Sequence, residues 1–134
     1  MSDRSADWLA QAERDLEHAA KDVRDGYYEH ACFESQQAAE KAVKAVYQRL
    51  HSEAWGHRAA KLLEGLSGLE TPPPPELINF GKMIDQYYIP TRYPNGFESG
   101  APKDFYTEEQ AQDAVNKAAS IIGWCAGILG TLKG

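Results

Sequence analysis

Residues 28–50 read YEHACFESQQAAEKAVKAVYQRL, and their pattern decides the fold. Small residues recur in this stretch at steps of three and four: Ala31, Ser35, Ala38, Ala42 and Ala45. This spacing places them along one side of an α-helix. Small side chains on that side let a neighbouring helix approach closely. The stretch therefore predicts a helix over residues 28–50 that packs tightly against another helix.

The segment before it carries a matching apolar stripe. Its members recur at helical spacing: Leu9, Ala12, Leu16, Ala19 and Val23. Gly26 follows, and glycine readily takes the left-handed conformation that ends a helix. Because only a tight turn separates the two helical stretches, they predict an antiparallel helix pair.

Two more helices are predicted in the middle of the chain. A short helix is expected over residues 57–66. Residues 72–75 are prolines and form a stiff connector, and a fourth helix can begin near Pro75 because proline is tolerated in a first helical turn. Its apolar stripe would consist of Leu77, Phe80, Ile84 and Tyr87 or Tyr88. This helix should end by Tyr88, because Pro90 disfavours helical angles at the residue before it.

The last part of the chain predicts a loop and a final helix. Residues 90–102 contain three prolines and two glycines, so they are expected to form a long loop. Thr107 and Gln110 have the spacing of a capping box at a helix start. The inward face of the final helix is expected to consist of Ala111, Ala114, Ala118, Ile121, Ile122, Cys125 and Leu129.

Length and composition favour one helical domain. The chain has 134 residues, of which 43% are hydrophobic and 25% are charged, which suits a single domain over residues 1–134 with a buried core. Strand-like alternation is nearly absent. We therefore expect an all-α fold: an antiparallel up-and-down helical bundle of four main helices plus a short helix. Cys32 and Cys125 are far apart and are expected to be reduced core residues.

The net charge and the targeting features of the sequence indicate which partners and which localisation to expect. The formal net charge of −6 argues against a general nucleic-acid coat protein, which needs a surplus of cations. The N-terminal residues include acids and no apolar signal segment. The longest uncharged part of the last helix is too short and too polar for a membrane span. We expect a cytoplasmic protein that does not associate with membranes.

Common catalytic and metal-binding motifs do not occur in the sequence. None of the four histidines, which are His18, His30, His51 and His57, belongs to an HExxH motif or to the Glu-x-x-His pairs of di-metal bundles. No GxSxG motif or phosphate-binding P-loop is present. We therefore expect no metal site, no cofactor and no catalytic nucleophile.

Two clusters of polar residues are candidates for binding. The first comprises Gln37, Glu40, Lys41 and Lys44, which are three and four residues apart and so share one side of the 28–50 helix. Two interpretations stay open. The residues can form a solvated face with weak ion pairs, or they can contact a ligand.

The second cluster lies where the fourth predicted helix gives way to a proline-rich turn. Here Arg92 is flanked by Tyr88 and Tyr93. A guanidinium offers a planar fork of donors for a phosphate, and tyrosine rings can stack on a base or on the arginine. Alternatively, Arg92 caps the C-terminal end of the fourth helix and orders the loop. The residues leave both interpretations open.

The chain resembles the HEPN domain family over nearly its whole length. The resemblance rests on Tyr28-x-x-Ala31 leading into FESQQAAEKAVKA, on His57 before Leu62-Leu63, and on Tyr88-x-x-x-Arg92-Tyr93-Pro94 before the closing helix. Many HEPN proteins resemble metal-independent endoribonucleases that carry an Arg-x4–6-His motif. The resemblance implies that Arg92 is the arginine of this motif. Positions 97–99 hold no histidine and none follows His57. We therefore expect no imidazole beside Arg92, and the chain looks more like the RYP-type group found with minimal nucleotidyltransferases.

The resemblance implies a non-catalytic binding module. It would form a homodimer, bind a nucleotide or RNA, and act with a minimal nucleotidyltransferase in a toxin–antitoxin or accessory role. The expected ligand-binding residues, in a groove between the second and fourth helices and the loop, are Arg92, Tyr93, Tyr88, Gln37, Lys41 and Lys44. Two alternatives stay open: a divergent ribonuclease toxin in which Tyr93 or His57 moves the proton, and a helical bundle that binds only proteins.

Overall fold

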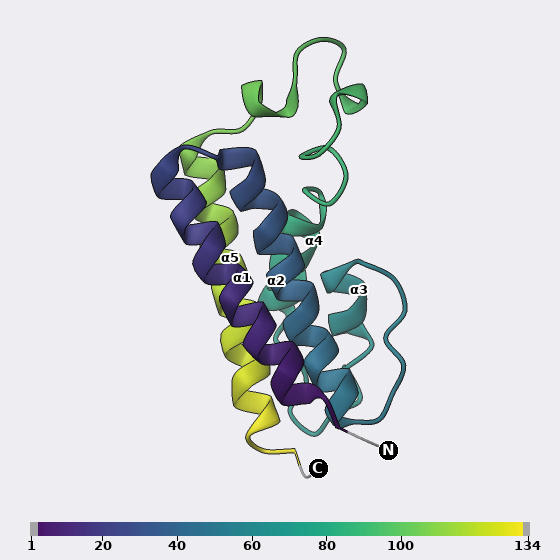
Figure 1. Cartoon of the computed structure of the whole chain (residues 1–134). Coiled ribbons are helices and arrows are strands. Elements are labelled where there is room, and N and C mark those ends of the chain that lie inside the picture. The colour runs from purple at the N-terminus through teal and green to yellow at the C-terminus, as the bar shows by residue number, and fades with distance from the viewer. Residues whose placement is uncertain (1–2, 133–134) are drawn as a thin grey trace.

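The computed structural model describes residues 3–132, and within that range the regular elements are all helical. Five α-helices follow one another along the chain (Figure 1). Their bounds are α1 (Ser5–Asp25), α2 (Tyr28–Arg49), α3 (Ala59–Glu64), α4 (Pro75–Asp85) and α5 (Glu108–Leu129). The all-α prediction is confirmed. The short helix is smaller than the predicted 57–66, because it begins at Ala59 and a turn replaces its last two residues.

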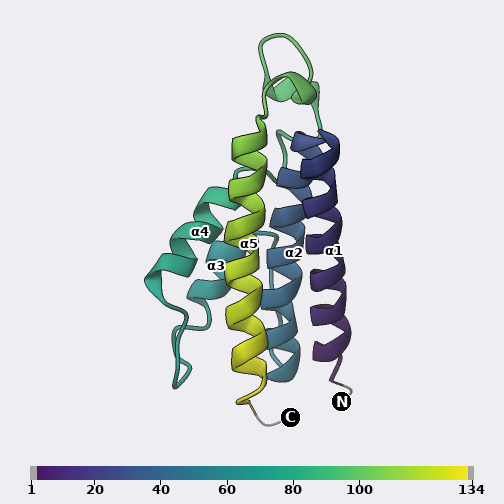
Figure 2. The ribbon, with the colours of Figure 1, turned by 90° about the vertical axis from the view of Figure 1, so that its left-hand side faces the viewer.

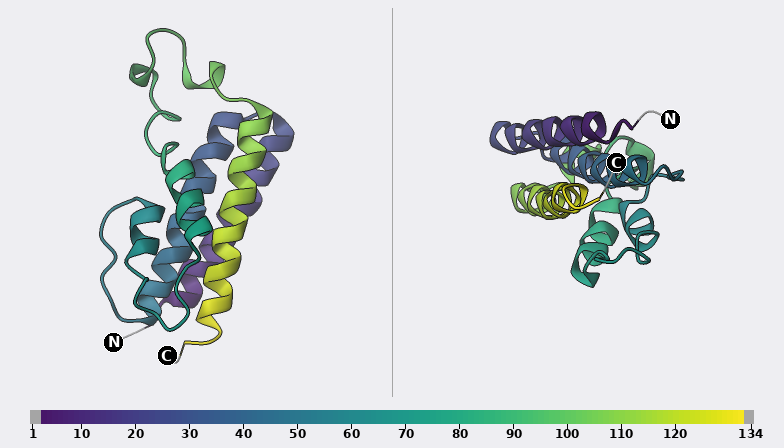
Figure 3. Two further views of the ribbon diagram at one scale, coloured as in Figure 1. Left: turned by 180° about the vertical axis from the view of Figure 1, so that it is seen from behind. Right: turned by 90° about the horizontal axis from the view of Figure 1, so that it is seen from below.

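Helix α2 lies at the centre of the bundle. α1 and α5 both pack against α2, while the short helices α3 and α4 pair with each other, α3 lying against α2 and α4 mainly against α5 (Figure 3). Its predicted small-residue stripe is fully buried: Ala31, Ser35, Ala38, Ala42 and Ala45. Because these side chains are short, two long helices approach α2 closely and bury its core-facing atoms. The prediction from residues 28–50 is therefore confirmed.

The long helices run up and down along one axis. α1 runs antiparallel to α2, while α5 returns in the same direction as α2 (Figure 2). The core-facing stripe of α5 is buried at every predicted position, from Ala111 to Leu129. Cys32 and Cys125 are free and buried, and burial raises the pKa of the Cys32 thiol to about 12. Among residues 3–132, no helix combines the length and the apolar character that crossing a bilayer requires.

Local signals end and begin the helices where the sequence predicts. Gly26 has φ of 86° and its N–H closes the end of α1. Pro75 is the first residue of α4. The N–H of Gln110 donates to Thr107 Oγ1 at 3.1 Å and the N–H of Thr107 donates to Gln110 Oε1 at 3.1 Å, which is the predicted capping box.

Helices α3 and α4 form a tightly joined pair. A Cβ atom added at Gly81 would lie 2.8 Å from the backbone nitrogen of Ala60, so only glycine permits this approach. The carboxylate of Asp85, at the end of α4, accepts hydrogen bonds from the N–H groups of Ala59 and Ala60 at 2.8 and 3.0 Å. The amide of the fully buried Gln36 also donates to Asp85, at 3.1 Å. One acidic side chain therefore caps α3 and ties it to both α4 and α2.

The chain leaves α4 through an extended excursion before α5. It contains two short 3₁₀ turns, η1 (Pro94–Gly96) and η2 (Pro102–Asp104). The rings of Phe97 and Phe105 stack at 4.2 Å between centroids and join its two arms. The segment projects beyond the ends of the long helices (Figure 1). The expected loop over residues 90–102 is thus built of turns, and its first residues carry Arg92.

Candidate functional site

The turn that follows α4 holds Arg92 in a defined position. Thr91 is buried, and its hydroxyl donates to the carbonyl oxygen of Tyr87 at 2.6 Å. The backbone N–H of Arg92 donates to Ile89 at 3.1 Å, and its side-chain Nε donates to the carbonyl oxygen of Tyr88 at 2.9 Å. Both hydrogen bonds are made to carbonyl oxygens beyond the last residue of α4, Asp85. Arg92 therefore orders the turn after α4, and these two bonds do not cap the helix itself.

Aromatic rings surround the guanidinium of Arg92. Its Cζ atom lies 4.7 Å from the ring centroid of Phe33, 4.8 Å from that of Tyr88 and 5.2 Å from that of Tyr93. Such positions over ring faces are favourable for a cation. Across residues 3–132, Arg92 forms no ion pair with a carboxylate, and Arg92 is exposed to solvent. The terminal nitrogens of the guanidinium are therefore available to an anion.

A histidine shares this aromatic cluster. The ring of His57 stacks on Tyr88 with 5.1 Å between centroids and 13° between planes. His57 Nδ1 lies 3.2 Å from Glu40 Oε2, and its carbonyl oxygen accepts from Gln36 Nε2 at 2.8 Å. The segment before α3 therefore places an imidazole against Tyr88, a neighbour that the linear sequence does not reveal. Tyr88 contacts both the guanidinium and the imidazole.

The polar cluster on α2, which comprises Gln37, Glu40, Lys41 and Lys44, is less exposed to solvent than the interpretation as a solvated face requires. Glu40 is buried, and it accepts from Lys44 Nζ at 2.9 Å as well as from His57. Gln37 donates to Gln36 at 2.7 Å and lies 3.5 Å from Glu40. A uniformly solvated face with weak ion pairs is therefore not what forms. Burial strengthens these contacts relative to a surface pair.

Lys41 points away from the Arg92 turn. Its Nζ pairs with Asp15 of α1 at 2.5 Å, in the contact between the first two helices. Gln37 and Lys44 connect to the cluster of Arg92 indirectly, through Gln36 and Glu40, which both contact His57. The six candidate residues thus form two groups: Arg92, Tyr88 and Tyr93 lie together, while Gln37, Lys41 and Lys44 follow α2.

Two shallow hollows adjoin the cluster. The first has a volume of about 430 Å³ and is lined by His57, Arg58, Asp85, Gln86, Tyr88, Ile89 and Pro90. The second has about 440 Å³ and shares Arg58, Asp85 and Gln86 with the first, adding Ala60, Lys61, Glu64 and Lys82. Arg58 and Glu64 are exposed. Since Asp85 is occupied in capping α3, the accessible charges of the two hollows are the cations Arg58, Lys61 and Lys82 and the carboxylate of Glu64.

Three members of this surface were missed by sequence reasoning. Phe33 enters the sequence analysis only as part of a family motif, His57 only in a motif and as the proton-moving residue of the ribonuclease alternative, and Arg58 not at all. No local spacing connects them to Arg92, because they come from α2 and from the segment before α3. A cation directly after His57 was the one available signal. Near Arg92 the candidate metal ligands His57 and Glu40 pair with each other.

Comparison with known proteins identifies the family. Residues 5–128 match the HEPN domain. The chain belongs to the HEPN family. Its fold is shared with the crystal structure of TT1696 from Thermus thermophilus, with a TM-score of 0.90 and 37% identity, covering 94% of this chain and 98% of that one.

Two structures described as HEPN proteins are also similar over most of their length. An archaeal HEPN homologue is 42% identical with a TM-score of 0.78, covering 95% of this chain and 98% of that one. A HEPN domain protein from Thermotoga maritima is 39% identical with a TM-score of 0.75, covering 92% and 97%. No curated protein matches the chain. The HEPN match over residues 5–128 includes the turn with Arg92.

Proposed function

We propose that this HEPN protein is a non-catalytic binding module for a phosphate-containing ligand, in the first place a nucleotide. The carrying observation is the guanidinium of Arg92, which rests on three aromatic rings, has its Nε hydrogen-bonded, and faces no carboxylate within residues 3–132. A cation held in this way presents a planar set of donors without having to break an ion pair.

The surroundings supply what a nucleotide needs. Tyr93 is 50% exposed, so its ring is accessible for stacking with a base. Arg58, Lys61 and Lys82 line the adjoining hollows and add positive charge for further phosphates. The proposed site therefore combines an aromatic platform with clustered cations on a protein of net charge −6.

The polar residues of α2 have different places in this proposal. Gln37 and Lys44 are proposed outer contacts, because both reach Glu40, which holds His57. Lys41 is a proposed contact only for a ligand that displaces Asp15. The residues that bind most directly in this proposal are Arg92, Tyr93 and Tyr88.

We further propose that the module acts as a homodimer with a minimal nucleotidyltransferase in the cytoplasm, in a toxin–antitoxin or accessory role. The support is the Arg92-Tyr93-Pro94 motif, which resembles the RYP-type HEPN group. Ile89 and Tyr93 are exposed apolar residues of the same turn, at 54% and 50%, and suit a protein contact beside the ligand. Tagged protein that captures no nucleotidyltransferase from its native cytosol would count against this partner.

Calorimetry with ATP and with inorganic phosphate tests the ligand site. Replacing Arg92 by alanine removes charge-assisted hydrogen bonds, so ATP affinity should fall roughly tenfold to hundredfold. Arg14→Ala is the matched control, because Arg14 is an exposed arginine of α1 whose side chain is 78% accessible. Unchanged ATP affinity in Arg92→Ala, or a wild-type protein that binds neither probe, would refute the proposal.

A second candidate function is a divergent metal-independent endoribonuclease. One observation favours it: His57, oriented by the buried carboxylate of Glu40, lies on the same tyrosine ring as Arg92. An imidazole can move a proton while a guanidinium holds the phosphate. Purified protein and its His57→Ala and Arg92→Ala variants should be incubated with RNA in the presence of a chelator. Cleavage that is lost in both variants would establish the ribonuclease, and no cleavage by wild type supports the binding module.

A further inference from the structure

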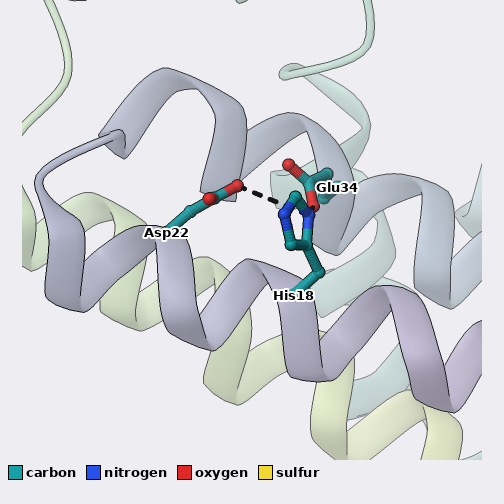
Figure 4. A group of neighbouring side chains, drawn as sticks. All are labelled: His18, Asp22 and Glu34. Carbon is teal, nitrogen blue, oxygen red and sulfur yellow. Dashed lines mark hydrogen bonds and ion pairs between the residues drawn. The ribbon is translucent and has the colours of Figure 1, made fainter.

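A second cluster of chemistry-bearing residues lies between α1 and α2. It consists of His18 and Asp22 from α1 and Glu34 from α2 (Figure 4). His18 and Asp22 are one helical turn apart, so their side chains emerge on the same side of α1. Glu34 meets them from the facing side of α2, as Figure 4 shows. Three potential ligands for a metal ion therefore converge from two helices.

The distances are close to those of a metal site. His18 Nδ1 hydrogen-bonds with Glu34 Oε1 and lies 3.8 Å from Asp22 Oδ2. One ligand atom from each residue lies within 4.8 Å of the other two. Ligands of a tetrahedral Zn²⁺ are about 3.3 Å apart, given bond lengths near 2.0 Å. Small side-chain rotations would bring the three atoms to that separation.

Burial leaves one carboxylate oxygen of this cluster without a hydrogen bond. Asp22 is only 9% exposed, and within residues 3–132 its buried Oδ2 has no hydrogen-bond partner, although it lies 3.8 Å from His18 Nδ1. An unsatisfied buried carboxylate oxygen is costly. The Glu34 side chain is 21% exposed, and burial, followed by the neighbouring Asp22, raises the pKa of Glu34 to about 7. Two carboxyl groups thus face each other with one imidazole between them.

We propose that His18, Asp22 and Glu34 form a binding site for a divalent transition-metal ion of the Zn²⁺ class. Two carboxylates neutralise the charge of one such ion, and the ion would satisfy Asp22 Oδ2. The imidazole favours zinc, nickel or copper over magnesium and calcium, which prefer oxygen ligands alone. The His18 side chain is 64% exposed, so the fourth position of a tetrahedral ion is accessible to water or a ligand.

The nearby charges are compatible with such an ion. Lys21 is the cation of α1 that lowers the pKa of His18, and its effect is smaller than that of Glu34 and Asp22, which raise it. The site is independent of the proposed nucleotide site. Phe33 contacts Arg92 while its neighbour Glu34 contacts His18, so adjacent residues of α2 serve different surfaces. Because the ligands come from two helices, a bound ion would also fasten α1 to α2.

Calorimetric titration of chelator-stripped protein with Zn²⁺ at neutral pH tests the site. Wild type should bind one ion per chain, and its thermal unfolding midpoint should rise with Zn²⁺. His18→Ala and Glu34→Gln should each weaken Zn²⁺ binding by more than about tenfold. His18 is exposed, so its alanine variant should fold, which circular dichroism without metal checks. His30→Ala is the matched control, because the His30 side chain is 60% exposed and lies outside the cluster.

Three results would overturn the metal site: wild type that binds no Zn²⁺, equal affinity in wild type and both ligand variants, or an equal loss in His30→Ala. Mg²⁺ that binds as tightly as Zn²⁺ would overturn the assignment to an imidazole-preferring ion. Asp22→Asn should weaken Zn²⁺ binding while keeping the side-chain volume. None of these results depends on Arg92 or on ATP, so the nucleotide proposal succeeds or fails separately.

Discussion

At the contact between α1 and α2, Lys41 pairs with Asp15 and His18 pairs with Glu34. At the turn after α4, the guanidinium of Arg92 rests on aromatic rings and faces no carboxylate in the part of the chain that the structure describes. In the first region each of these two basic side chains has a carboxylate partner on the facing helix, so the pairs join α1 to α2. In the second, a cation is positioned without a counter-charge, which is the arrangement that a bound anion completes. The two regions therefore differ in charge pairing: Lys41 and His18 have carboxylate partners, whereas Arg92 has none within residues 3–132.

The largest effect on stability is expected from replacing Asp85, an acidic residue that lines both hollows beside the Arg92 cluster. Asp85→Ala leaves two N–H groups of α3 and the buried amide of Gln36 without their acceptor. The free energy of unfolding should fall by about 2–4 kcal/mol, as measured by urea denaturation. Glu76→Ala, an exposed acidic residue of the same helix, serves as control. An Asp85→Ala variant as stable as wild type would mean that these hydrogen bonds contribute little to folding. The contrast between charged residues that are paired within the protein and Arg92 would then fail.

A smaller effect on the free energy of unfolding, which depends on pH, is expected from Glu34. Its folded-state pKa of about 7 lies above the ordinary 4.5, so the folded protein binds this proton more tightly than the unfolded chain does. The resulting stability is complete below pH 4.5 and is lost as the pH rises through about 7. The raised pKa of His18, caused first by its hydrogen bond with Glu34, acts in the same direction. Asp22 and Lys21 are the other charges that face this pair.

Glu34→Gln cannot ionise and should therefore flatten this part of the pH dependence. Between pH 5 and pH 8 the unfolding free energy of wild type should fall by about 2–3 kcal/mol more than that of the variant. Urea denaturation at both pH values, with a chelator present to keep metal off the site, measures the difference. Parallel pH profiles for wild type and variant would show that Glu34 is already solvated and ionised in the folded protein.

The smallest effect is expected at Lys41, and it sharpens the distinction between matched and unmatched cations. Lys41→Met keeps the aliphatic stem and removes a charge that pairs with Asp15. ATP affinity should stay within about twofold of wild type, because the lysine serves the α1–α2 contact. Calorimetry under the conditions used for Arg92→Ala checks this. A loss comparable to that of Arg92→Ala would show that Lys41 leaves Asp15 for the ligand.

The predictable part of the fold follows from local rules. The alanine stripe of α2, the glycine after α1, the proline at the start of α4 and the capping box of α5 each act within a few residues, and each occurs as predicted. The candidate site was less predictable. Arg92 and its flanking tyrosines were recognisable as a local motif, whereas Phe33 and His57 reach it from other elements. Glu40 looked like a surface residue, because its burial depends on Lys44 and on the segment before α3.

By itself, the sequence determined the helices, their ends and their buried stripes, since periodicity and capping are properties of neighbouring residues. The motif around Arg92 was also visible in the linear order. Only the tertiary structure decided that His57 stacks on Tyr88, that Lys41 turns to α1, and that Glu34 meets His18 and Asp22. These contacts join residues that are distant along the chain, and they form because helix packing and the paths of the loops bring those residues together. Packing therefore decided which charged side chains pair with one another.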